Sequence, residues 1–150
     1  MLRISVCLFL TVALVGCGSS DTSKPLPKTA PVSGVVTMNK KPLASATVTF
    51  HPDAGTKGTD CTGRTDEAGK YTLTQQHGAA GAPPGKYKVT VSLIMRGDGT
   101  PLPEDGAGEG GVAVETLSGK YSDLGKTTLK ADVPESGGEI NFDLKGKKKK

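Results

Sequence analysis

Apolar and polar residues alternate through most of the chain between residues 32 and 144, and this period of two predicts β-strands. In one such segment Ala46, Val48 and Phe50 point to one face, while the polar residues between them point to the other. Seven segments show the pattern: 33–38, 45–51, 71–74, 86–93, 112–115, 128–133 and 139–144. No segment shows a convincing helical period with caps, so we expect an all-β fold.

Turn-forming residues separate these segments. They occupy 66–69, 83–85 and 134–138, and we predict that 134–138 joins the last two strands as a hairpin. Short strands with one apolar face each bury those faces against one another, which predicts a β-sandwich over residues 32–144. The apolar positions predict its core: Val36, Val48, Phe50, Tyr71, Leu73, Tyr87, Val89, Val91, Leu129, Ile140 and Phe142.

The N-terminal residues resemble a targeting signal rather than part of the fold. Arg3 precedes a largely apolar run that ends at Val15. This run is shorter than the roughly 20 apolar residues of a transmembrane helix and is typical of a secretory signal. An ordinary secretory signal that happens to contain a cysteine is one interpretation of it.

The end of this run favours a more specific interpretation, because Leu14-Val15-Gly16-Cys17 resembles the lipobox of bacterial lipoproteins. The resemblance implies that residues 1–16 are a signal peptide that is removed, that Cys17 receives a diacylglycerol by thioether linkage, and that its new amine is acylated. Two or more acyl chains hold a protein stably on a membrane. The resemblance therefore implies a lipid-anchored protein of the cell envelope. Gly18 stands where an Asp would signal retention, which favours the outer membrane over the inner membrane.

Charge is distributed unevenly over the 150 residues, whose formal net charge is +4. Between residues 32 and 144, 11 Lys and Arg stand against 14 Asp and Glu, so the basic excess belongs to the chain ends. Residues 17–31 comprise Cys17 and a segment rich in Ser, Thr, Lys and Pro, and this composition predicts a flexible tether. Residues 145–150 form a lysine-rich tail that either contacts anionic lipid or wall polymer or is a solvated end. Nucleic-acid binding needs basic residues clustered on the fold, usually with aromatics, so we expect no nucleic-acid partner.

The chain has three cysteines, too few for a disulfide-stapled fold. Cys7 leaves with the predicted signal and Cys17 is the predicted lipidation site, which leaves Cys61 alone. Cys61 is a buried apolar side chain, an intermolecular disulfide site or an exposed thiol. No CxxC partner lies beside it, so we expect an inert thiol.

Three motifs in order between residues 32 and 93 resemble carboxypeptidase regulatory-like domains. The first motif comprises GVV at 34–36, KPL at 41–43 and ATVTF at 46–50, the second is TDEAGKYTL at 65–73, and the third is PGKYKV at 84–89. The resemblance implies a transthyretin-like, seven-stranded Greek-key sandwich.

Glycines within these motifs mark turns. Gly69 and Gly85 stand where a turn needs unrestricted φ. Lys40 departs from the family, which commonly has a turn glycine there. The preceding Asn39 tolerates positive φ, so we still expect a turn at this point.

No catalytic constellation or metal site emerges from the chemistry-bearing residues, and we expect no cofactor. His51 on the polar face of a strand and His77 in a Gly/Ala-rich loop read as solvated side chains. The tyrosines at 71 and 87 read as core residues rather than iron ligands. The four acidic residues within 98–109 match no EF-hand spacing and predict a mobile loop.

These features favour a non-catalytic, lipid-anchored protein of the cell envelope. Its β-sandwich would act as an interaction or structural module through an edge strand or a loop face, with an envelope protein as partner. The alternative is a module that binds polysaccharide or peptide, with its site in the loops around residues 52–64 and 95–111.

Overall fold

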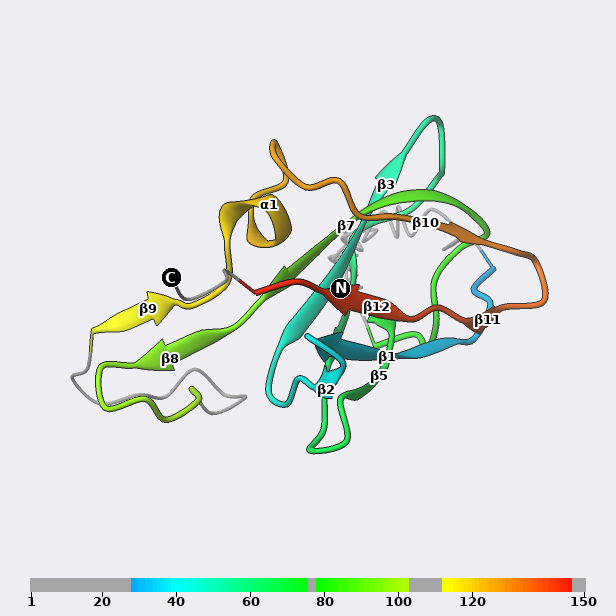
Figure 1. The fold of residues 1–150 in the computed structure, drawn as a ribbon. Coiled ribbons are helices and arrows are strands. Elements are labelled where there is room, and N and C mark those ends of the chain that lie inside the picture. Colours follow the sequence, from blue (N-terminus) through cyan, green and yellow to red (C-terminus); the bar gives the residue numbers. More distant parts are fainter. Residues whose placement is uncertain (1–27, 76–77, 103–111, 147–150) are drawn as a thin grey trace, which may run out of the picture.

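A computed structural model describes residues 28–75, 78–102 and 112–146 of the chain (Figure 1). Within these ranges the strands form two five-stranded sheets and one two-stranded ribbon. The single helix that the described residues contain is α1 (Gly119–Ser122), one turn long. The expected predominance of β-structure is confirmed, and the seven-stranded Greek-key topology stays a prediction. The predicted signal peptide, Cys17, His77 and the last four lysines lie outside the described residues.

The first sheet is built around β1 (Val32–Met38). On one side β1 pairs in parallel with β11 (Gly138–Glu139) and β12 (Phe142–Leu144). On its other side it pairs antiparallel with β2 (Lys41–Pro42) and β5 (Lys70–Thr72). β1 is therefore the central strand of this sheet.

The second sheet is antiparallel throughout. Its strands lie in the order β10 (Lys130–Val133), β7 (Gly85–Ser92), β3 (Thr47–Asp53), β4 (Cys61–Arg64) and β6 (Thr74–Gln75). The register between β3 and β7 runs over the whole length of β3. This pair forms the middle of the sheet and determines which side chains face inward.

Leu73 carries the chain from one sheet to the other. It separates β5 from β6, its side chain is fully buried, and its amide donates to the Val32 carbonyl at 2.9 Å. The segment 71–74, predicted as one strand, is therefore shared between two sheets. Gly63 lies beside this crossing, where a Cβ would come within 2.5 Å of the Thr72 carbonyl oxygen.

The buried faces of both sheets contribute to one hydrophobic core. Phe50 lies at its centre, with its ring centroid 5.6 Å from that of Tyr87, 6.1 Å from Phe142 and 6.4 Å from Tyr71. Tilted and edge-on aromatic pairs at such distances stabilise a core beyond their buried area. The aromatic residues of the chain are thus largely committed to packing.

Most of the predicted core residues are buried, and the observed core also contains buried apolar residues outside the prediction, among them Val32, Val133 and Leu144. Leu129 and Ile140 are only partly buried, while the other nine predicted residues are buried. Both exceptions lie just outside strands, so the alternation that predicts burial no longer governs where they point.

The two predicted turns around β2 and β5 are present. Asn39 and Lys40 have φ angles of 51° and 65°, as a two-residue hairpin between β1 and β2 requires. Gly69 has a φ of 74°, and a Cβ there would lie 2.5 Å from the Val36 carbonyl oxygen. Glycine is therefore needed at residue 69 both for conformation and for space.

The prediction that residues 134–138 form a hairpin is wrong. β10 pairs with β7 in the second sheet, whereas β11 and β12 pair with β1 in the first. The Gly138 amide donates to the Pro31 carbonyl at 2.9 Å. The backbone after the turn therefore forms its hydrogen bonds with the β1 segment rather than with β10. The turn residues permit a change of direction, and the backbone partners decide which sheet the chain enters.

Backbone pairing with the fold begins at Ala30, two residues before the boundary predicted for the domain. Ala30 and Ala82 exchange backbone hydrogen bonds of 2.8 and 3.0 Å, and Ala30 is buried. The end of the predicted tether is therefore attached to the fold.

Candidate functional site

A two-stranded ribbon projects from the body of the protein. β8 (Ile94–Arg96) follows β7 after one residue and pairs antiparallel with β9 (Ala113–Glu115) (Figure 1). β9 lies in the predicted segment 112–115. β8 was missed, because the predicted strand 86–93 ends before it and residues 95–111 were assigned to a loop.

The base of the ribbon is fixed by one carboxylate. Glu115 Oε1 accepts the amides of Leu93 at 3.1 Å and Leu117 at 2.8 Å, and its other oxygen accepts the Ser92 hydroxyl. The Thr116 hydroxyl donates to the Leu93 carbonyl at 2.8 Å. These bonds connect both sides of the ribbon to the end of β7, so the ribbon projects in a defined direction.

Apolar side chains are exposed on this ribbon. Ile94, Val112 and Val114 are 43%, 76% and 48% exposed. In the register Ile94 opposes Glu115 and Val114 opposes Met95, so Ile94 and Val114 point to opposite faces of the ribbon. Within the part of the chain that the structure describes, the other large exposed apolar side chain is Leu124, after α1.

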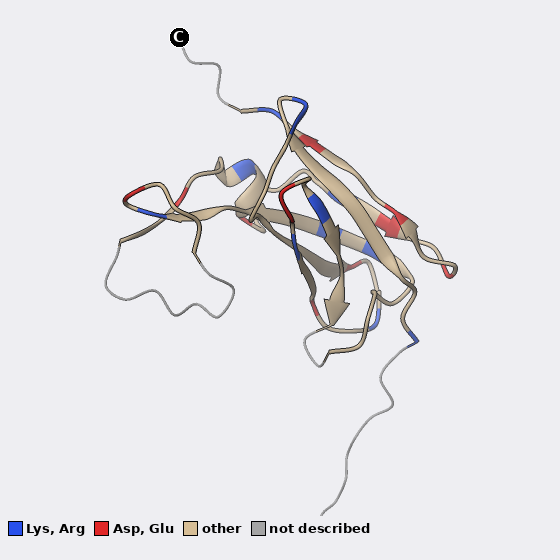
Figure 2. Ribbon diagram, turned by 90° about the horizontal axis from the view of Figure 1, so that it is seen from below, with Lys and Arg blue, Asp and Glu red and all other residues tan. Residues whose placement is uncertain are grey.

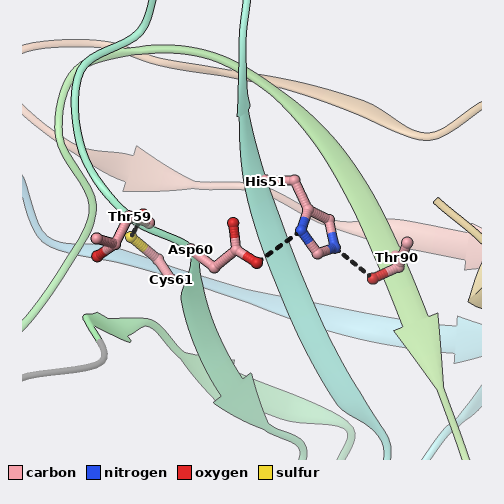
Figure 3. Close-up of polar contacts among 5 residues, drawn as sticks. All are labelled: His51, Thr59, Asp60, Cys61 and Thr90. Atoms are coloured by element: carbon pink, nitrogen blue, oxygen red, sulfur yellow. Dashed lines mark hydrogen bonds and ion pairs between the residues drawn. The ribbon is translucent and has the colours of Figure 1, made fainter.

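His51 is held between two partners on the outer face of the second sheet (Figure 3). Its Nδ1 lies 2.8 Å from Asp60 Oδ2, and its Nε2 lies 3.0 Å from Thr90 Oγ1. The side chain is thus joined to the segment before β4 and to β7 rather than to solvent alone. A carboxylate, an imidazole and a hydroxyl in this order resemble the relay that activates a nucleophile. Thr90 is only 8% exposed, however, so its hydroxyl offers a substrate little access.

Cys61 is a buried side chain, which is one of the three roles that the sequence left open for it. Its side chain is fully buried in the core, and Sγ lies 3.5 Å from the Thr59 carbonyl oxygen. Burial, reinforced by the negative charge of Asp60, raises the pKa of the thiol to about 11. The thiol therefore stays protonated at neutral pH, which is the unreactive form.

The two loop regions named as an alternative site are only partly loops. Residues 61–64 of the first region form β4, and residues 95 and 96 at the start of the second belong to β8. Arg64 was not expected in a strand, because the sequence CTGR of β4 shows no clear alternation of apolar and polar residues. The guanidinium of Arg64 donates to the Leu102 carbonyl, which connects the end of the first region to the middle of the second.

The acidic stretch 98–109 is represented in the described residues by Asp98. Its carboxylate accepts the Thr100 hydroxyl at 2.6 Å and the Thr100 amide at 2.9 Å, and these hydrogen bonds lower the pKa of Asp98. The carboxylate is thereby used to close a turn. The remaining acids of the stretch lie outside the described residues, within which no group of three His, Cys, Asp or Glu side chains is placed to hold a metal ion.

A shallow polar groove of about 300 Å³ lies on the outer side of the second sheet and its junction with β5. It is lined by Thr47, Thr62, Gly63, Arg64, Thr72 and Thr74. The groove offers hydroxyl groups and one guanidinium for hydrogen bonding. It is carried by strands, not by the loops in which the alternative site was expected.

The chain matches no protein-family model and no curated protein sequence. Among solved structures, a 9R-lipoxygenase from Cyanothece PCC8801 is similar over 82% of this chain and 17% of its own length, at 15% identity and a TM-score of 0.35. A likeness of this degree carries no argument about fold or function. Within the described residues no helix has the length and apolar character needed to cross a membrane.

Proposed function

We propose that the chain is a non-catalytic, lipid-anchored protein of the cell envelope whose β-sandwich, of the transthyretin-like Greek-key type, serves as an interaction module. The observation that carries the proposal is the ribbon of β8 and β9. Ile94 and Val114 expose apolar side chains on the two faces of this projecting ribbon, and exposed apolar surface on a projecting element favours association with a protein partner. The firm attachment of the ribbon through Glu115 supports a role as a docking element.

The positions of the chain ends support an anchored arrangement. The described chain begins at one end of the molecule, and the ribbon projects from the opposite end (Figures 1 and 2). An anchor at Cys17, in the outer membrane, would therefore leave the ribbon on the side away from the lipid. A partner in the envelope would find the ribbon accessible.

Charge substitutions on the ribbon test the interaction module. We expect Ile94→Lys with Val114→Lys to lower the yield of envelope proteins that copurify with the chain at least fivefold, because two buried apolar contacts would be replaced by charges. Leu124→Lys, on an equally exposed apolar residue away from the ribbon, is the matched control and should leave the yield unchanged. Equal yields for all three proteins would exclude the ribbon as the docking element.

The anchor has a separate test. The chain should incorporate labelled palmitate in cells, and Cys17→Ser should abolish both the label and the membrane fractionation, since only a thiol accepts the diacylglycerol. A Cys17→Ser protein that keeps label and fractionation would contradict the lipoprotein assignment.

The polar groove favours a second candidate function, binding of a polysaccharide. Its threonine hydroxyls and Arg64 can form hydrogen bonds with sugar hydroxyls. Under this candidate, glycan-array binding should be lost in Arg64→Met and kept in the ribbon variants. The reverse pattern would exclude the groove.

A further inference from the structure

Three lysines surround an open groove at the end of the molecule where the described chain begins. The groove has a volume of about 550 Å³, and Lys28, Lys57 and Lys86 contribute to its lining. All three are exposed. In the described part of the chain the ion pairs are His51–Asp60 and Lys126–Asp123, so none of these three lysines is in an ion pair there.

The floor of this groove is built by specific contacts. The Lys86 amide donates to Thr56 Oγ1 at 2.8 Å, and the same hydroxyl donates to the Lys86 carbonyl at 2.9 Å. Gly85, with a φ of 148°, allows this approach, because a Cβ there would lie 2.4 Å from Thr56 Oγ1. The loop that carries Lys57 is thus fixed against the start of β7, which carries Lys86.

The lysines continue along the outer face of the second sheet. Lys88 follows Lys86 on the same face of β7 and lies directly opposite Lys130 of β10. Like charges directly opposite each other destabilise a sheet. Both lysines are exposed, so their charges are available to a partner of opposite charge.

Carboxylates on the same face cancel only part of this charge. Asp53 and Asp132 lie opposite Lys86 on the two neighbouring strands, and Asp60 is paired with His51. The face therefore carries five lysines against three carboxylates, one of which is already engaged. An anionic partner remains favoured there.

We propose that this lysine face, defined by Lys28, Lys57, Lys86, Lys88 and Lys130, docks on the anionic headgroups of the membrane that holds the chain. The inference rests on the proposed lipid anchor at Cys17, because that anchor would hold the fold close to the membrane. Ten residues lie between Cys17 and Lys28, and the chain from one to the other spans at most about 40 Å. The face lies at the end of the fold where the anchored segment enters, and its positive charge complements the negative surface of such a leaflet. Docking would keep the ribbon pointed away from the bilayer.

Lysine footprinting on the full chain in nanodiscs tests the docking. The chain is reconstituted in discs of phosphatidylcholine alone and in discs of equal parts phosphatidylcholine and phosphatidylglycerol, and acetylation of each lysine is followed by mass spectrometry. We expect acetylation of Lys28, Lys57 and Lys86 to slow about fivefold in the anionic discs and to recover in high salt. Lys41 and Lys70, which belong to the first sheet, should react equally in both discs.

A pair of double variants separates local contact from general charge. Lys57→Gln with Lys86→Gln should remove the protection of Lys28, whereas Lys41→Gln with Lys70→Gln should keep it. Equal acetylation rates in the two discs, or equal slowing at every lysine, would overturn the inference. Protection by soluble polyphosphate but not by anionic discs would also overturn it and would identify an anionic polymer as the partner.

The anchor and the lysine face are distinguished by their readouts. Palmitate labelling of Cys17 together with unprotected lysines would overturn the docking alone. Protected lysines on a chain that incorporates no palmitate would overturn the anchor and, with it, the route by which this face reaches the membrane.

Discussion

Single residues take their properties here from neighbours that are distant in the sequence. Cys61 is inert because the core covers it and Asp60 opposes its ionisation. His51 joins Asp60 to Thr90, which lies 39 residues further along the chain. The sequence allowed Cys61 three roles and gave His51 no partner, because neither burial nor a cross-strand contact is readable from local residue types.

The buried thiol predicts a loss of stability in alkaline solution. Its ordinary pKa is 9.0, and the folded protein raises this to about 11. Between these values the unfolded chain loses the proton while the folded chain keeps it, so the free energy of unfolding falls as the pH rises. The full effect of two pKa units is about 3 kcal/mol. Urea titrations at pH 8 to 11 measure it.

Cys61→Ala is the control for this titration. Burial also raises the pKa of Tyr71 and of Tyr87, so the variant should still lose stability at high pH, but with a shallower slope. Parallel curves for the two proteins would show that the thiol makes no contribution.

Elements were predictable where side chains alternate and were missed where they do not. β1, β3 and β7 each have a clean apolar face and lie close to their predicted positions. β4 is short and contains Gly63, so its membership of the second sheet depends on pairing with β3 and β6 rather than on its own pattern. The sheet to which β11 belongs was unpredictable for the same reason.

The hairpin between β1 and β2 offers a test at the level of one element. Lys40 has a φ of 65°, a left-handed conformation that costs a residue with a side chain about 1–2 kcal/mol. We expect Lys40→Gly to raise the free energy of unfolding by about 0.5–1 kcal/mol, after allowance for the greater freedom of glycine in the unfolded chain. Thermal or urea unfolding measures the change.

Lys41→Gly in the adjoining strand is the matched control. Its backbone has no positive φ to relieve, so glycine there should destabilise the protein. A Lys40→Gly protein as unstable as Lys41→Gly would contradict the account of this turn.

The whole molecule has two different ends. The described chain enters beside the lysine groove, while the ribbon, α1 and the end of the last strand lie away from it (Figures 1 and 2). Tyr121 of α1 holds that last segment, because its hydroxyl accepts the Lys145 amide at 2.9 Å. The C-terminal basic tail therefore starts far from the lysine groove. The two basic regions lie on different sides of the molecule.

This division could be only partly foreseen from the sequence. The leader and lipobox motif predict an anchor, and the alternating strands predict the body that the structure describes. The exposed ribbon could not be predicted, since its apolar residues match those of a buried strand and their exposure is seen only in the described part of the structure.

Photo-crosslinking in intact envelopes tests the central claim most directly. A photoreactive amino acid placed at Val114 on the ribbon, and in a matched protein at Leu124, reports what contacts each position. The account predicts one discrete crosslinked protein from residue 114 and none from residue 124. Equal, diffuse labelling from both positions would contradict an interaction module that uses the ribbon.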